Sequence, residues 1–169
     1  MPIKEFFELL ADKKFPASNW LRKMEQLDYL EEPDMFHDTF GHVPLLTNQA
    51  FCDFLAEFSK ISLKYINDEY AIKLMQRLYW FTVEFGLIKE DSQLKIYGGG
   101  IISSSGESVY SLCSGVPNRV PYSIAEILNT EVKIDTYQKK YFVIDSYEQL
   151  FQSLPKFEEI LEQQLLVYQ

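Results

Sequence analysis

The chain has 169 residues, of which 47% are hydrophobic and 15% are aromatic, and this length and composition fit one packed domain of residues 1–169. Its formal net charge of −9 argues against a nucleic-acid partner, which requires a basic surface, and against docking on anionic membranes. Because the first residues do not resemble a signal peptide and no run of about 18 apolar residues is present, we expect a cytoplasmic domain whose Cys52 and Cys113 stay reduced.

Most of the chain is predicted to be helical. Apolar residues cluster at 6–10 and predict a short opening helix, which Pro16 ends. Residues 48–67 carry apolar side chains every three to four positions, which indicates an amphipathic helix. The same spacing over residues 72–85 predicts a second long helix that ends at Gly86.

The C-terminal third adds short strands. β-branched and aromatic residues at 132–134 and 141–144 predict two strands that form a hairpin across residues 135–140. Two helices are expected after them, split by Pro155, and the second, residues 157–166, presents a Glu-rich face to solvent. The expected fold class is therefore mainly α, an α+β domain with minor strands and a small β-hairpin.

His37 and His42 are the two histidines of the chain, and they lie five residues apart. On an unbroken α-helix, five residues turn the chain through about 500°, so the two rings would point about 140° apart and could not share a metal ion. Gly41 is typical of a helix C-terminus, and Pro44 disfavours the α conformation at Val43. We therefore expect a break, with His37 on the last turns of a helix and His42 on an extended segment. No HExxH pattern is present, which disfavours a zinc hydrolase.

A third ligand is expected from Glu84, which lies in the most apolar stretch of the chain, residues 78–87. An ionised carboxylate is rarely buried unpaired, because its desolvation is costly. The alternative is a solvated Glu84 side chain, and the neighbouring Trp80, Phe81 and Phe85 argue against it. Two imidazoles and one carboxylate are the ligand set associated with non-heme Fe(II) centres, with about three coordination positions left open.

Residues 98–100 are three consecutive glycines. They lack the spacing of a phosphate-binding loop. We interpret them as a point where the backbone approaches the active site closely.

Three motifs resemble those of a known family. They are EPDMFHDTFGHVPL at residues 32–45, YWFTVEFGL at 79–87 and YGGGIISSSGES at 97–108. Together they resemble the tetrahydropterin-dependent aromatic amino acid hydroxylases, most closely the bacterial phenylalanine 4-monooxygenases. The resemblance covers about residues 5–151 and implies a helical catalytic domain. Bacterial members carry a segment before the equivalent of Phe6, and we expect this chain to lack it.

The resemblance also implies roles for individual residues. The implied iron ligands and catalytic residues are His37, His42 and Glu84. The residues implied to bind the aromatic substrate are Arg22, Pro33, Trp80, Phe85, Gly100 and Ser103. The residues implied to bind the pterin are Phe6, Asp38 and Tyr79. The Arg22 guanidinium would pair with the substrate carboxylate, and Ser103 would orient His37. Without the resemblance, Arg22 is more simply a surface charge.

The activity implied is that of an Fe(II)- and tetrahydropterin-dependent monooxygenase in phenylalanine catabolism. It would hydroxylate L-phenylalanine to L-tyrosine with O2, and we expect a monomer with small-molecule partners alone. One alternative is tryptophan or relaxed aromatic specificity. Another is a catalytically incomplete fragment that binds iron, because the expected absence of the N-terminal segment leaves the pterin site half present.

Overall fold

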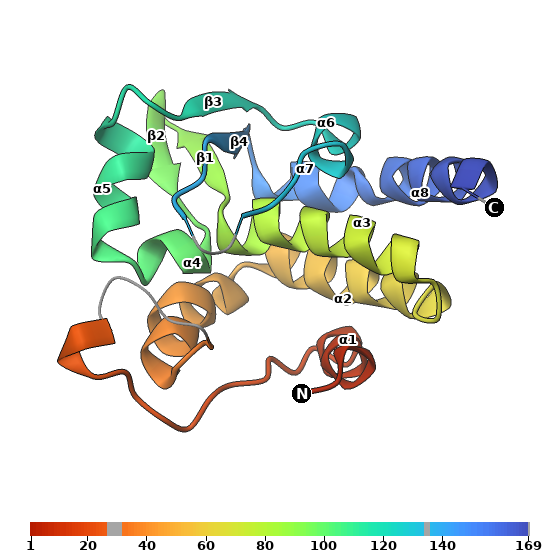
Figure 1. The fold of residues 1–169 in the computed structure, drawn as a ribbon, viewed down its shortest axis with the longest axis horizontal. Helices are drawn as coiled ribbons and strands as arrows, with labels where there is room; N and C mark the ends of the chain where they lie inside the picture. The colour runs from red at the N-terminus through yellow and green to blue at the C-terminus, as the bar shows by residue number, and fades with distance from the viewer. Residues whose placement is uncertain (27–31, 134–135, 169) are drawn as a thin grey trace.

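The structure is a computed structural model, and it describes residues 1–26, 32–133 and 136–168. The α-helices are α1 (Ile3–Ala11), α2 (Gln49–Lys64), α3 (Glu69–Tyr79), α4 (Gly99–Ile102), α5 (Ser105–Cys113), α6 (Ile124–Leu128), α7 (Tyr147–Gln152) and α8 (Leu154–Tyr168). The 3-10 turns are η1 (Met24–Gln26) and η3 (Val43–Thr47), and the π-helical turns are η2 (His37–His42) and η4 (Trp80–Glu84). The strands are β1 (Leu87–Glu90), β2 (Gln93–Ile96), β3 (Asn118–Pro121) and β4 (Lys140–Ile144). The predicted fold class is confirmed, because helices dominate and the strands form one small sheet (Figure 1).

The predicted helices of the first half are confirmed, and local signals set their ends. The Asn48 side chain accepts a hydrogen bond from the Phe51 N–H at 3.0 Å and caps α2, as a helix N-cap residue does. Asp68 caps α3 in the same way through the Ala71 N–H at 2.9 Å. The opening helix α1 ends at Ala11, well before the expected stop at Pro16.

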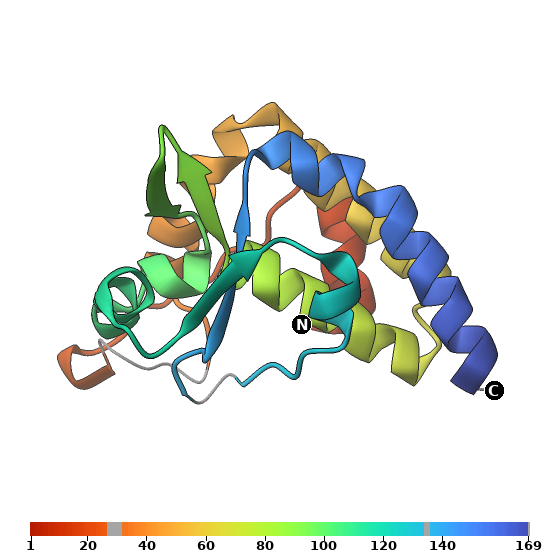
Figure 2. The same cartoon turned by 90° about the horizontal axis from the view of Figure 1, so that it is seen from above.

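An aromatic core joins the long helices. Phe7 of α1 packs edge-on against Phe58 of α2, with ring centroids 5.8 Å apart. Phe58 also contacts Phe54 at 5.9 Å and Phe157 of α8 at 5.7 Å. Each fully buried ring of this kind stabilises the fold by roughly 1.5–3 kcal/mol. These contacts hold α1 and α8 against α2, and Figure 2 shows α8 running along the helical side of the molecule.

The sheet has the order β2-β1-β4-β3. β1 and β2 form an antiparallel hairpin, whose turn places Asp91 and Ser92 at φ values of 49° and 64°. Two consecutive residues in this left-handed region give the turn geometry that two-residue hairpins favour. β4 is parallel to both of its neighbours, β1 and β3. Tyr141, Phe142 and Ile144 of β4 are fully buried, as expected for a central strand.

The predicted hairpin over residues 132–144 is wrong. Residues 141–144 do lie in a strand, but Val132 and Lys133 are irregular, and Ile134 lies outside the described residues. The partners of β4 are distant in the chain, because a parallel pair requires a crossover connection rather than a tight turn. The hairpin of the fold lies instead at residues 87–96.

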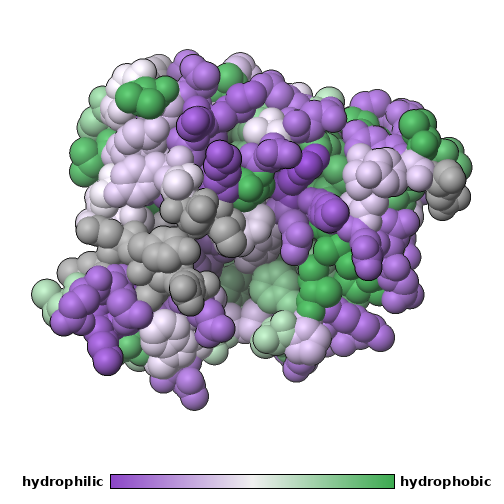
Figure 3. All heavy atoms as spheres, in the orientation of Figure 1, coloured by the Kyte–Doolittle hydropathy of each residue, from purple (hydrophilic) through white to green (hydrophobic). Residues whose placement is uncertain are grey.

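Two helices close the chain, as predicted, but their boundary is shifted. The break falls at Ser153, and Pro155 lies in the first turn of α8, where its missing N–H leaves no helical bond unmade. Among the described residues, no helix combines the length and apolar character needed to cross a membrane. Figure 3 shows mainly hydrophilic residues on one face, with hydrophobic atoms toward the end of α8, whose Leu166 and Val167 are exposed.

Candidate metal centre

The segment that carries both histidines is one continuous π-helical turn, and the predicted break is therefore wrong. The Val43 N–H donates to the Asp38 carbonyl, five residues earlier, and Val43 keeps α-like angles of −55° and −41° despite the proline that follows it. In a π-helix the repeat of five residues is close to one turn. His37 and His42 therefore project on the same side of η2. Gly41 does not end the helix but lets it approach α4, since an added Cβ would lie 2.9 Å from the Gly99 Cα.

Glu84 is presented by a second π-helical turn. The predicted helix continues regularly to Tyr79, after which the Phe85 N–H bonds to the Trp80 carbonyl at 2.8 Å, five residues back. This change of pitch lies at the end of α3 and turns the carboxylate inward. Glu84 is 5% exposed, so the expectation of a buried carboxylate is confirmed and the solvated alternative is wrong.

The three side chains converge at one point. The Nε2 atoms of His37 and His42 lie 2.9 Å apart, and Glu84 Oε1 and Oε2 lie 3.2 Å from His42 Nε2 and 3.5 Å from His37 Nε2. Two donors at right angles and about 2.1 Å from one metal ion are about 3 Å apart, so these distances fit three ligands on one face of an octahedron. Buried Glu84 Oε2 accepts no hydrogen bond from a described residue. The donor set therefore fits a divalent cation such as Fe(II).

The charges of the centre are coupled. Burial raises the pKa of the Glu84 carboxyl, but the charge and hydrogen bond of His42 and the charge of His37 outweigh it, and the net pKa is lowered. Burial lowers the pKa of both imidazoles; the Glu84 charge reverses this for His42, whose pKa is raised, but not for His37, whose pKa stays lowered. An ionised carboxylate beside nitrogen lone pairs is the state that binds a metal.

The two imidazoles are held in different ways. His37 Nδ1 lies 2.7 Å from the Ser103 hydroxyl, which confirms the expected contact between them. Buried His42 Nδ1 has no hydrogen-bond partner among the described residues. The His42 ring is held instead by packing against the backbone of Gly99 and against the ring of Phe15, whose centroid is 4.8 Å away. The predicted close approach of the glycine run to the site is confirmed.

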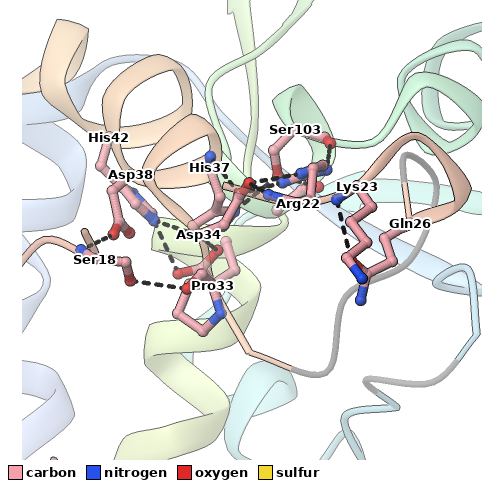
Figure 4. A network of polar contacts seen from close by, with 12 residues as sticks. Ser18, Arg22, Lys23, Gln26, Pro33, Asp34, His37, Asp38, His42 and Ser103 are labelled. Atoms are coloured by element: carbon pink, nitrogen blue, oxygen red, sulfur yellow. Dashed lines mark hydrogen bonds and ion pairs between the residues drawn. The ribbon is translucent and has the colours of Figure 1, made fainter. Parts of the chain in front are cut away.

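Arg22 is not a solvated surface charge. Its guanidinium donates to Asp34 Oδ1 at 2.7 Å, to Asp34 Oδ2 at 3.1 Å and to the Ser103 carbonyl at 2.8 Å. The Arg22 side chain is 7% exposed and that of Asp34 is fully buried. Burial raises the pKa of Asp34, but the hydrogen bonds from Arg22 and from the His37 amide hold it well below its usual range. Figure 4 shows how this network connects Arg22, Asp34, His37 and Ser103.

The predicted substrate residues are partly brought together. The rings of Trp80 and Phe85 stack with centroids 5.6 Å apart and planes inclined by 18°. Gly100 lies against Phe85 and Glu84, because an added Cβ would be 3.1 Å from the Phe85 ring and 3.3 Å from Glu84 Oε2. Pro33 is exposed, and its carbonyl accepts a hydrogen bond from Ser18. These contacts form an aromatic wall beside the candidate metal ligands.

The predicted pterin residues lie on three elements, α1, η2 and α3. The Phe6 ring of α1 meets the Tyr79 ring edge-on, with centroids 5.5 Å apart. Asp38 is buried and accepts the Ser18 N–H at 2.6 Å. Burial, together with the charges of Glu84 and Asp38, raises the pKa of the Tyr79 hydroxyl well above its usual value. Tyr79 and Asp38 therefore lie close enough to the metal ligands to share their electrostatic field.

Sequence reasoning missed two residues of this site. Asp34 pairs with Arg22 and accepts the His37 N–H at 3.0 Å. It directly precedes the helical residues that begin at position 35, and an Asp just before a helix is an N-cap signal that could have indicated it. Phe15 packs on His42 from a segment without regular structure. We find no sequence signal for Phe15.

The chain is similar throughout to one protein family. The family model described as biopterin-dependent aromatic amino acid hydroxylase matches residues 1–169. Phenylalanine-4-hydroxylase of Ralstonia nicotianae is 52% identical over 163 residues, which are 96% of this chain and 52% of that protein. The Chromobacterium violaceum enzyme of the same name is 53% identical over 89% of this chain and 50% of its own length. The chain thus spans about half the length of the curated relatives it matches.

Solved structures agree with this similarity. The crystal structure of Chromobacterium violaceum phenylalanine hydroxylase with bound iron(III) and 7,8-dihydrobiopterin superposes with a TM-score of 0.91 and 50% identity, covering all of this chain and 60% of that chain. The iron- and phenylalanine-bound structure of the same enzyme gives a TM-score of 0.89 at 47% identity, covering 98% of this chain and 59% of that chain.

Proposed function

Because this chain belongs to the biopterin-dependent aromatic amino acid hydroxylase family, we propose that it takes part in the hydroxylation of L-phenylalanine to L-tyrosine, with Fe(II), a tetrahydropterin and O2. The observation that carries the proposal is the convergence of His37, His42 and Glu84, whose donor atoms lie 2.9–3.5 Å apart beside an aromatic wall. Relatives of this chain are phenylalanine-4-hydroxylases.

In this proposal the two histidines and Glu84 hold Fe(II) through one face of its coordination sphere. The iron and the tetrahydropterin together supply the electrons that activate O2 when both are bound. The protein orients the substrate and excludes water from the site. Trp80 and Phe85 offer a stacked apolar surface for an aromatic ring, and a ring seated on buried Phe85 and half-buried Trp80 would keep water from the reacting carbon.

Arg22 is proposed to bind the substrate carboxylate. Asp34 and the Ser103 carbonyl fix the plane of its guanidinium, and a fixed plane suits a planar, charge-assisted carboxylate contact. Gly100, Ser103 and the exposed Pro33 are proposed to border the substrate. Phe6, Asp38 and Tyr79 are proposed to border the pterin, and Phe6 also packs against the aromatic core. Monomeric state and cytoplasmic location stay predictions.

The test is a turnover assay. The chain is loaded with Fe(II), supplied with L-phenylalanine, tetrahydropterin and O2, and scored for L-tyrosine by chromatography. We expect tyrosine in proportion to oxidised pterin, and loss of both iron and turnover in Glu84→Ala. Glu126→Ala removes an exposed glutamate of α6 that pairs with Lys140 rather than with a candidate metal ligand, and it should leave both unchanged. Turnover by an iron-free Glu84→Ala would overturn the proposal.

The same assay separates the alternatives. Faster hydroxylation of tryptophan than of phenylalanine would assign the chain another substrate preference within the family. Iron bound in the expected one-to-one ratio without any tyrosine would favour an iron-binding fragment. Calorimetric titration with a tetrahydropterin then identifies whether the pterin site or the chemistry is missing.

A further inference from the structure

We infer that Glu107 is a positioning residue for the amino-acid substrate: it holds the corner between α4 and α5 against β4, and through that corner it fixes the two contacts of Ser103. This inference rests on the proposed function for its substrate. Glu107 is not one of the candidate metal, substrate or pterin residues. It is nonetheless a carboxyl that is only 6% exposed, and such a group requires partners.

Glu107 has two partners, one in the central strand β4 and one in the segment just before it. Its Oε1 accepts the Tyr141 hydroxyl at 2.6 Å and the Gln138 N–H at 3.2 Å. Tyr141 is a fully buried residue of the central strand β4, and it packs in a small hydrophobic cluster with Phe85 and Ile101. One end of the contact is therefore anchored in the sheet and in the wall of the site. Both donors bond the same oxygen atom, and an amide oxygen at this position could also accept both bonds.

A second contact presses the same loop onto α5. A Cβ added to Gly106 would lie 1.9 Å from the Tyr137 hydroxyl oxygen, so a larger residue at position 106 would displace the Tyr137 side chain. The Tyr137 ring also meets the Tyr110 ring of α5 at 5.1 Å. Residues 137 and 138 are thus docked on the first turns of α5 by polar and aromatic contacts together.

Hydrogen bonds within the corner connect Glu107 to Ser103, which lies four residues earlier in the chain. The Ser104 hydroxyl accepts the Glu107 N–H at 3.2 Å, and the Ser108 hydroxyl lies 2.7–2.8 Å from the carbonyls of Ser104 and Ile101. These bonds tie the start of α5 to the end of α4, which Figure 1 shows as adjoining helices. Ser103 lies at the apex of the corner.

Ser103 then makes one contact to each of two site residues. Its hydroxyl lies 2.7 Å from His37 Nδ1, and its carbonyl accepts from the Arg22 guanidinium at 2.8 Å. A shift of the corner would tilt the proposed carboxylate-binding guanidinium. His37 would be affected less, because its metal-binding Nε2 is also constrained by the other two ligands. Loss of Glu107 is therefore expected to weaken substrate binding more than iron binding.

The experiment compares three variants with the unmodified chain. Glu107→Leu removes the acceptor, Glu107→Gln keeps an acceptor oxygen without the charge, and Tyr141→Phe removes one of the two donors. Glu148→Leu, on an exposed glutamate of α7, is the matched control. Two quantities are measured: amide hydrogen exchange across residues 103–107, and the Kd of L-phenylalanine for the Fe(II)-loaded chain without O2, by calorimetry.

Glu107→Leu should speed exchange at residues 103–107 and raise the Kd of L-phenylalanine about tenfold, with the iron content at saturating Fe(II) unchanged. Glu107→Gln should keep the exchange rate and the Kd at the values of the unmodified chain. Tyr141→Phe should give values between those of the unmodified chain and those of Glu107→Leu. Wild-type exchange in Glu107→Leu, or an equal loss in Glu107→Gln, would overturn the inference. If Glu107→Leu does not fold, the pair Glu107→Gln and Tyr141→Phe decides. Absence of phenylalanine binding by the unmodified chain would overturn the proposed function, while the exchange data still decide the role of Glu107.

Discussion

Substitution of Gly99 by alanine tests whether packing alone orients His42. An added Cβ would lie 2.4 Å from His42 Cε1 and 2.8 Å from both ring nitrogens, whereas ordinary contact begins at 3.4 Å. The ring must therefore move by about 1 Å, and metal ligands tolerate only about 0.2 Å. The Phe15 ring, whose centroid is 4.8 Å from that of His42, also restricts this movement.

We expect Gly99→Ala to weaken metal binding by about 10–100-fold, which is about 1.4–2.7 kcal/mol. Alanine is the better helix former by about 1 kcal/mol, so a loss cannot come from the backbone of α4. The assay is an anaerobic titration of Fe(II) or Co(II) against a competing chelator, with circular dichroism to check the fold. The matched control is Gly115→Ala, since nothing lies within 4 Å of a Cβ there. A folded Gly99→Ala with the affinity of Gly115→Ala would refute the reasoning.

Three further predictions concern the network around Arg22. Arg22→Ala should lower the free energy of unfolding by about 3–5 kcal/mol, because it leaves buried Asp34 unpaired; urea unfolding measures this, and the exposed Lys23→Ala should change it by less than about 0.5 kcal/mol. Because the pKa of Asp34 is lowered in the folded chain, its contribution to stability is complete above about pH 5, where the unfolded carboxyl is also ionised, and is lost progressively as the pH falls toward the lowered folded pKa. Asp34→Asn should therefore flatten the fall in unfolding free energy between pH 5 and 3, and an unchanged slope would contradict the assignment. Ser103→Ala should weaken metal binding about tenfold through the lost contact to His37; chelator competition checks it, and full affinity would show that the other two ligands suffice.

Local chemistry made several parts of the site predictable. The apolar spacing around residues 48–67 and 72–85 predicted α2 and α3, because a helix that buries one face repeats every three to four residues. The identities of His37, His42 and Glu84 indicated a metal centre before any geometry was known, since imidazole and carboxylate are the ligands that Fe(II) takes. The glycine run at residues 98–100 predicted a close backbone approach, because glycine has no Cβ to keep other groups away.

Tertiary structure decided how these parts meet. The change from α to π pitch in η2 and η4 brings His37 and His42 to one side and turns Glu84 toward them; the sequence alone predicted a break instead. The parallel neighbours of β4 come from distant parts of the chain, and the residues next to β4 in the sequence do not indicate this pairing. Local sequence determined which groups are present and which segments are helical, because those depend on neighbours within one turn. Contacts across dozens of residues determined the pitch, the pairing and the site, because they depend on what packs against each segment.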